Sequence, residues 1–186
     1  MNLIIRKFEV MRGERKIVYP FTTYSCIFDA DKLPDSMPKT LQNYLKQVFM
    51  CGVPPNLTKS VSSLPHLVVE TKEIESSLVS MALEANYRGL RHKQHECVQN
   101  YLLAHDPDTI AIEVPVWDED TLGHIDIIRL GPKIGVWDFK PEARKEKKAG
   151  GQVLRYIAFL SKLLKLPLRE FEGGYYDDKN CYSIIF

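Results

Sequence analysis

Three short β patterns follow one another in residues 109–139, which read TIAIEVPVWDEDTLGHIDIIRLGPKIGVWDF. The first runs from Thr109 to Trp117, the second from Leu122 to Leu130 and the third from Ile134 to Phe139. An acidic turn and a Gly-Pro turn separate them, and turns this short connect antiparallel strands. The stretch therefore predicts an antiparallel three-stranded meander.

Helical patterns flank this meander on both sides. One long helix is predicted from Glu73 to about His105, where Asp-Pro-Asp ends it. A second helix is predicted from about Gly151 to Lys165, and its buried stripe consists of Val153, Ile157, Leu160 and Leu164. Two short tyrosine-containing β patterns around Asp-Asp-Lys-Asn then predict a terminal hairpin. The order along the chain is helix, three strands, helix, strand.

An N-terminal extension precedes this core. Residues 1–28 alternate as strands do, and residues 39–50 have apolar side chains at helical spacing. Residues 51–65 are rich in Pro, Ser and Thr and are predicted to be a linker. We therefore divide the chain into a β/α extension, residues 1–70, and a main domain, residues 71–186.

Composition excludes several classes of protein. The chain has 186 residues, ample for one domain with a real core, and no apolar run approaches the ~18 residues of a membrane span. The first residues do not resemble a signal peptide, and the four cysteines form no CxxC pair, so we expect reduced thiols in a cytoplasmic protein. The net charge of +1 does not by itself favour nucleic acid.

Two acids stand inside the apolar strands of the meander. Pairing of the second and third strands brings Asp126 near Asp138 at one end of their hairpin. Lys140 points to the same face as Asp138, because side chains alternate along a strand. A divalent cation beside Lys140 would relieve the repulsion between the two carboxylates. The alternative is a structural salt bridge between Asp138 and Lys140.

Polar residues on the two flanking helices extend this pattern. Gln152 and Tyr156 stand at i and i+4 on the second helix, and His92 and Glu96 share one face of the first. In chain order the motifs are Gly-x-x-His-x-x-x-Glu, Gly-His-Ile-Asp, Asp-Phe-Lys and Gln-x-x-x-Tyr. With these motifs, residues 85–165 resemble the PD-(D/E)XK nuclease superfamily, most of all its RecB-like branch, which includes CRISPR-associated nucleases and small nucleases of archaeal viruses and plasmids.

The resemblance implies a restriction-endonuclease-like αβββαβ core, with a mixed central sheet flanked by helices, and hydrolysis of DNA with Mg²⁺ or Mn²⁺. The catalytic residues that it implies are Glu96, Asp126, Asp138, Lys140, Gln152 and Tyr156. The metal ligands would be Asp126, Asp138, Glu96 and the backbone carbonyl of Phe139, which offer the oxygen atoms that Mg²⁺ prefers. His92 matches a histidine that RecB-like members often place before the helical acid. The residues expected to contact DNA are Lys145, Lys148, Gln152 and Tyr156.

Some assignments stay open at this point. Glu84 could serve in place of Glu96, and Glu113 of the first strand could also approach the metal. Relatives with an iron–sulfur cluster carry several clustered late cysteines, whereas only Cys181 follows the Gln-x-x-x-Tyr motif here, so we expect no cluster. Basic residues follow the third strand at Arg144, Lys145, Lys147 and Lys148. They could track a DNA backbone or form a solvated face.

Charge is distributed unevenly along the chain. Residues 104–128 carry a net charge of −7, and residues 139–169 carry +7. An acidic meander that holds a cation, followed by a basic segment that meets phosphates, is what a metal-dependent nuclease requires. The sequence thus predicts a metal-dependent deoxyribonuclease that acts in the cytoplasm, in that of a host cell if the protein is viral. The alternatives are a junction-resolving endonuclease, which would act as a homodimer, and a nucleic-acid-binding protein that has lost cleavage.

Overall fold

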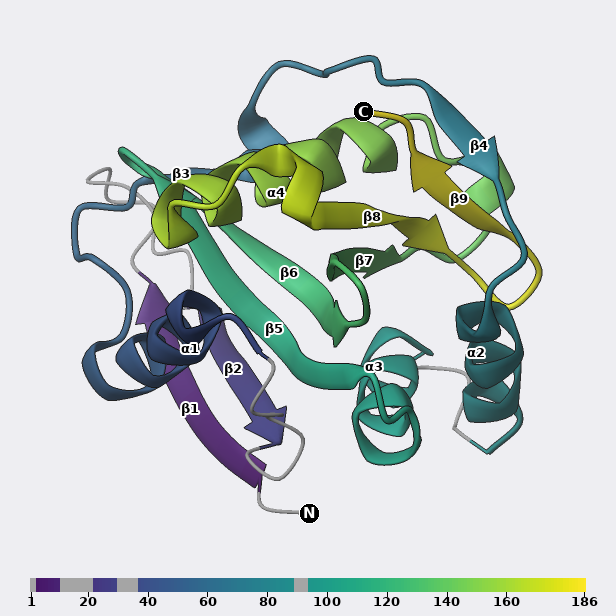
Figure 1. Cartoon of the computed structure of the whole chain (residues 1–186), viewed down its shortest axis with the longest axis horizontal. Coiled ribbons are helices and arrows are strands. Elements are labelled where there is room, and N and C mark those ends of the chain that lie inside the picture. The colour runs from purple at the N-terminus through teal and green to yellow at the C-terminus, as the bar shows by residue number, and fades with distance from the viewer. Residues whose placement is uncertain (1–2, 11–21, 30–36, 89–93) are drawn as a thin grey trace.

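The computed structural model describes residues 3–10, 22–29, 37–88 and 94–186. Within these ranges the chain forms a mixed sheet of nine strands flanked by helices (Figure 1). Eight of the strands follow the order β1-β2-β5-β6-β7-β8-β9-β4, and β3 pairs with β6 outside this path. The α/β class expected from the sequence is therefore confirmed.

The elements have the following bounds. The strands are β1 (Leu3–Val10), β2 (Thr22–Asp29), β3 (Lys59–Ser60), β4 (Thr71–Glu73), β5 (Thr109–Asp118), β6 (Thr121–Leu130), β7 (Ile134–Phe139), β8 (Phe171–Tyr176) and β9 (Cys181–Ile184). The helices are α1 (Lys39–Cys51), α2 (Ser77–Arg88), α3 (Gln94–His105) and α4 (Ala149–Leu164), with 3₁₀ turns η2 (Val61–Ser63), η4 (Ala143–Lys145) and η5 (Leu168–Glu170). None of these described helices combines the length and apolarity needed to cross a membrane.

The predicted meander is present. Strands β5, β6 and β7 pair antiparallel in chain order, and β7 has the predicted bounds. Helix α4 then carries the chain across the sheet to β8, which pairs parallel to β7. A crossover connection of this kind is what a parallel neighbour requires. The predicted terminal hairpin is the antiparallel pair of β8 and β9.

The long helix predicted from Glu73 to His105 is wrong. Glu73 belongs to strand β4, and two separate helices, α2 and α3, lie side by side (Figure 1). Leu78 of α2 and Leu102 of α3 belong to one buried cluster, so the two helices cover a common apolar surface. Helical spacing in the sequence continues across the junction between them, which is why it predicts one helix. His92 falls in that junction and lies outside the described residues.

Two buried clusters lie on opposite faces of the sheet, and the alternation of side chains along β7 separates them. Ile134 and Val136 pack in the cluster that includes α1 and α4, which we name the α4-side core. Trp137 and Phe139 pack in the cluster that includes α2 and α3, which we name the α3-side core. The stripe predicted for the helix after the meander is buried in the α4-side core.

The described strands among residues 1–70 extend the same sheet. Strand β2 pairs with β5 through Ile27 opposite Ile112 and Phe28 opposite Ala111. Helix α1 packs in the α4-side core, and the hydroxyl of Tyr44 donates a hydrogen bond of 2.6 Å to the carbonyl oxygen of Pro115. The N-terminal residues are thus joined to the meander by strand pairing and by packing.

Gly123 of β6 provides the space in which Tyr156 of α4 lies. A Cβ at position 123 would lie 2.4 Å from Cε1 of Tyr156 and 2.9 Å from Cγ2 of Val61, so a larger residue must displace a buried ring. We therefore expect Gly123→Ala to lower the free energy of unfolding by about 1–3 kcal/mol, measured by urea denaturation. Gly131→Ala is the matched control, because nothing lies within 4 Å of a Cβ at that position. Equal effects of the two substitutions would contradict this packing.

Candidate metal and catalytic site

The two predicted acids face each other where β6 and β7 separate. The last registered pair of this ladder at that end is Ile127 with Trp137, and Asp126 and Asp138 are the next residues along the two strands. Their carboxyl groups lie close enough to share a hydrogen bond. Only 6% of Asp126 and 2% of Asp138 is exposed to solvent. The structure therefore brings this predicted pair together in a buried setting.

Lys140 places a positive charge beside the two acids. Its Nζ lies 2.7 Å from Oδ2 of Asp138. A structural salt bridge would account for Asp138 and Lys140, but it does not account for the second buried acid, Asp126.

A histidine that was not expected contacts Asp126. His95 lies in the first turn of α3, and its Nε2 is 2.6 Å from Oδ2 of Asp126. The backbone N–H of Phe139 donates a hydrogen bond of 2.9 Å to the same oxygen. Glu96, which was predicted as a catalytic residue and metal ligand, is exposed and does not belong to this group of close ligand atoms. The helical residue that reaches Asp126 is therefore His95.

Glu113 of β5 is the third acid of the site. One ligand atom each of His95, Glu113 and Asp126 lies within 4.8 Å of the other two. The side-chain amide of Gln99 donates a hydrogen bond of 2.6 Å to Oε1 of Glu113 and orients it. Imidazole nitrogen and carboxylate oxygen suit Mn²⁺, and carboxylates suit Mg²⁺, so these three side chains fit a divalent cation.

An irregularity shared by β5 and β6 explains how two acids fit between apolar layers. Residues two apart in a strand normally share a face. Here Ile112 and Ile127 pack in the α3-side core, whereas Val114 and Ile125 pack in the α4-side core. Both strands thus change faces at Glu113 and at Asp126 opposite it. The backbone of Glu113 has φ 52°, a left-handed conformation that costs a residue other than glycine about 1–3 kcal/mol.

Burial raises the pKa of all three acids. The pKa of Asp126 rises to about 6, because burial outweighs the hydrogen bonds that it accepts. Burial and the neighbouring Asp126 charge raise the pKa of Asp138 well above its usual range, and burial raises that of Glu113. Burial lowers the pKa of His95. A bound cation would favour the ionised acids and neutral imidazole, so cations and protons compete for this site.

Gln152 and Tyr156 approach the acids from α4. The Gln152 side-chain amide donates a hydrogen bond of 2.5 Å to the Tyr156 hydroxyl. Burial, and then the charge of Asp138, raise the pKa of Tyr156 above its usual range. The ring of Tyr156 lies against Gly123, three residues before Asp126 on β6, so α4 carries the predicted Gln-x-x-x-Tyr pair to the strand that bears this acid.

The basic residues predicted to contact DNA follow β7. Lys145 lies in η4, where its Nζ pairs with Oε1 of Glu142 at 2.6 Å and both side chains are exposed. Lys148 directly precedes α4 and is exposed. Glu142 thus compensates part of the charge of Lys145. Lys148 is nearer to Gln152 along the chain.

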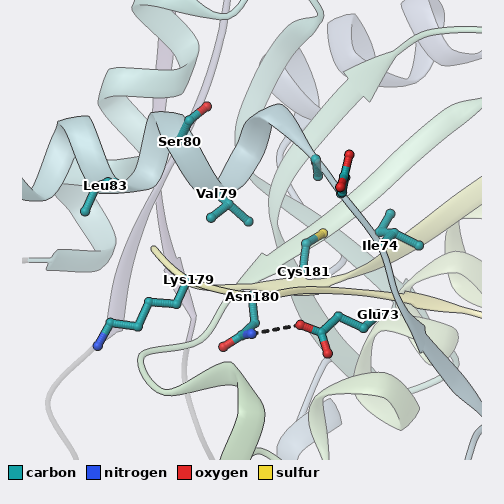
Figure 2. A pocket seen from close by; sticks show the side chains of 10 residues that line it. Glu73, Ile74, Val79, Ser80, Leu83, Lys179, Asn180 and Cys181 are labelled. Carbon is teal, nitrogen blue, oxygen red and sulfur yellow. Dashed lines mark hydrogen bonds between the residues drawn. The ribbon is translucent and has the colours of Figure 1, made fainter.

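A larger cavity lies away from these residues. It has a volume of about 520 Å³ and is lined by residues before and within α2 and by the turn between β8 and β9 (Figure 2). The side-chain amide of Asn180 donates a hydrogen bond of 2.9 Å to Glu73 in this cavity. Burial raises the pKa of Cys181 to about 11, which disfavours its thiolate as a nucleophile. The cavity shares no residue with the acidic site.

The chain has no match among protein-family models, curated proteins or solved structures. The resemblance to the PD-(D/E)XK superfamily therefore stays a prediction that rests on four motifs.

The spacing of buried residues along α3 could have identified His95 from the sequence. Val98, Gln99 and Leu102 are buried, and His95 lies four residues before Gln99 on the same helix face. A stripe counted from the start of α2 instead arrives at Glu96, because it assumes one unbroken helix. Counting backward from Leu102 gives the observed face.

We expect Asp126→Asn to stabilise the metal-free protein at high pH. The pKa of Asp126 is raised by folding, so the folded state holds more protons than the unfolded state between pH 3.8 and about 6, and stability falls as the pH rises through this window. The variant should gain about 3 kcal/mol in free energy of unfolding at pH 8, in urea titrations with a chelator, and most of the gain should be lost near pH 4.

The control for this substitution is Asp106→Asn. Asp106 is also buried, but it pairs with Arg129 at 2.8 Å and accepts a hydrogen bond from Thr109. Loss of this pair should destabilise the protein by about 3 kcal/mol at pH 8. A loss of stability of similar size in both variants would contradict the proposed charge repulsion.

Cation binding tests whether the ligands beside Asp126 are His95 and Glu113, as the structure indicates, or Glu96, as the sequence predicted. Mn²⁺ at 100 times its Kd should add about 2.7 kcal/mol to the stability of the wild type, measured as a rise in Tm. Glu113→Gln and His95→Ala should lose most of this rise, because each removes a ligand atom. Glu96→Gln should retain it. The opposite result for Glu96 and Glu113 would restore the original assignment.

Proposed function

We propose that this protein is a metal-dependent deoxyribonuclease that hydrolyses phosphodiester bonds. The observation that carries the proposal is the opposed, buried pair of Asp126 and Asp138, with the Lys140 ammonium 2.7 Å from Asp138. Two acids and a lysine in this arrangement are the residues of the Gly-His-Ile-Asp and Asp-Phe-Lys motifs. Their convergence from two strands supports the resemblance on which the proposal is based.

The order of elements also supports the proposal. Helix α3, the meander of β5, β6 and β7, helix α4 and the parallel strand β8 follow the αβββαβ order of a restriction-endonuclease-like core. In this arrangement the pairing of β6 with β7 ends next to an acid on each strand, and α4 packs Tyr156 of the Gln-x-x-x-Tyr pair against Gly123 of β6. We therefore propose this core as the finer description of the fold.

The side chains divide the chemical work as follows. A bound Mg²⁺ or Mn²⁺ would lower the pKa of a water and neutralise charge on the phosphate. Asp126 and Glu113 offer carboxylate oxygens, and His95 offers an imidazole nitrogen, to hold that cation. Asp138 holds Lys140 by charge at the edge of the site, where the ammonium can stabilise an anionic oxygen.

The charges of the site favour catalysis over a purely structural role. Three acids lie close to one another with raised pKa values, and one lysine stands beside them. Such a group destabilises the fold at neutral pH when no cation is bound. Groups with perturbed pKa values gather at functional sites, and here they also converge on a common point.

Cleavage of DNA with and without metal tests the proposal. The wild type should cut at least one member of a panel of single-stranded, duplex, flap and four-way DNA in Mg²⁺ or Mn²⁺, and a chelator should abolish cleavage. Asp138→Asn and Lys140→Met should each lower the rate by about 100-fold or more, because Lys140 carries the charge that stabilises an anionic oxygen and Asp138 holds it in place. Gel electrophoresis of end-labelled DNA measures the rates.

Glu172→Gln provides a matched control, because Glu172 is an exposed acid on the neighbouring strand β8. It should cut DNA at the wild-type rate. Wild-type cleavage in Asp138→Asn would refute the mechanism, and preferential cutting of four-way DNA would identify the junction-resolving form of the activity. Binding of DNA without any cleavage would favour a nucleic-acid-binding protein of the same fold.

A further inference from the structure

A cavity of about 150 Å³ lies between α4 and residues 61–67, a segment of the N-terminal extension that includes η2. Its polar side chains come from both sides: Ser62 and His66 from the segment, and Lys148, Gln152 and Arg155 from α4 and the residue before it. The three residues from the α4 side stand at i, i+4 and i+7 and therefore share one helix face. We name this space the 61–67 cavity.

The polar lining of the 61–67 cavity is basic. Lys148 and Arg155 carry positive charges, His66 adds ring nitrogens, and the lining contains no Asp or Glu. Glu146 lies near its edge, where Oε1 accepts a hydrogen bond of 2.9 Å from the backbone N–H of Lys148, but Glu146 does not line the cavity. A small lined space with this charge suits an anion, and Arg with Lys is the combination that binds phosphate groups.

Contacts with α4 hold the wall of this cavity in place. The guanidinium of Arg155 donates a hydrogen bond of 2.5 Å to the carbonyl oxygen of Pro65. A Cβ on Gly151 would lie 2.2 Å from the carbonyl oxygen of Leu67, so only glycine allows the segment to approach the helix this closely. Val61 is buried in the α4-side core at the base of the segment. The N-terminal extension is thus fixed against the helix that carries Gln152.

Gln152 connects the 61–67 cavity with Tyr156 of the candidate site. This residue lines the cavity and donates its hydrogen bond to Tyr156, whose ring lies against Gly123, three residues before Asp126 on β6. A DNA strand whose phosphate is held at the acids therefore has a basic space beside it on the α4 side. Phosphate contacts of this kind set the position of a strand without reading its bases.

We infer that the 61–67 cavity binds a second phosphate group of the DNA strand, next to the phosphate at the acidic site. This inference rests on the proposed function, since it takes DNA as the substrate. It assigns residues 61–67 a part in holding the substrate, which the motifs of the core do not contain. The phosphate is either an internal diester or a terminal monoester, and both present anionic phosphate oxygens to the cavity.

Binding of fluorescent DNA to the metal-free protein tests the inference without requiring cleavage. His66→Glu places a negative charge in the lining and should weaken binding by about 10-fold. Val68→Glu is its matched control, because Val68 lies in the same stretch of chain, is 91% exposed and does not line the cavity. It should change the Kd by less than about 2-fold. Anisotropy titrations at several salt concentrations give the Kd values.

A second pair of variants removes a charge instead of adding one. Lys148→Gln should weaken binding and reduce the slope of log K against log salt by about 1, because one phosphate contact is lost. Lys133→Gln, in the exposed turn at the far end of β7, should leave that slope unchanged. Each binding experiment uses DNA with a 5′-phosphate and with a 5′-hydroxyl. An effect confined to the phosphorylated DNA identifies a terminal monoester.

The outcomes separate this inference from the proposed function. Weaker binding by both cavity variants but not by the controls supports the inference, even if the wild type cuts no DNA and the proposed function fails. Wild-type binding by His66→Glu and Lys148→Gln overturns the inference, even if the wild type cuts DNA. Equal weakening by cavity and control variants, or no DNA binding by the wild type, overturns it as well.

Discussion

The burial of Asp126 and Asp138 opposite each other is the constraint on which the candidate site depends. Two carboxyl groups that face each other in a buried setting cannot both be ionised at low cost, and Glu113 adds a third acid. Lys140 offsets only part of this charge. The fold therefore carries a cluster whose electrostatic balance a bound cation would complete.

The surrounding structure positions this cluster rather than relieving it. The left-handed backbone of Glu113 and the change of faces in β5 and β6 place two of the acids between the two buried cores. Helix α3 contributes His95 and Gln99 from one side of the sheet, and α4 contributes Tyr156 from the other. A local distortion in the strands and packing on both faces thus act together at one point.

Local patterns predicted most of the framework. Alternation and short turns predicted the meander, and register alone placed Asp126 opposite Asp138, because a two-strand hairpin leaves few pairings open. The face of α4 was also predictable from its apolar stripe. Which face of α3 points toward the sheet was not predictable from α2, because α2 and α3 are separate helices and apolar spacing does not encode the rotation of one relative to the other. Glu96 was therefore named where His95 lies.

The sequence by itself determined the α/β class, the meander and the chain order of the acids, because each depends on neighbours along the chain or on one hairpin. Only the tertiary structure decided that His95 and Glu113 join Asp126, and that residues 61–67 lie against α4. These contacts join elements distant in sequence, and their geometry depends on a change of faces in two strands and on the packing of separate helices. Such terms are set by the whole fold, and no local periodicity contains them.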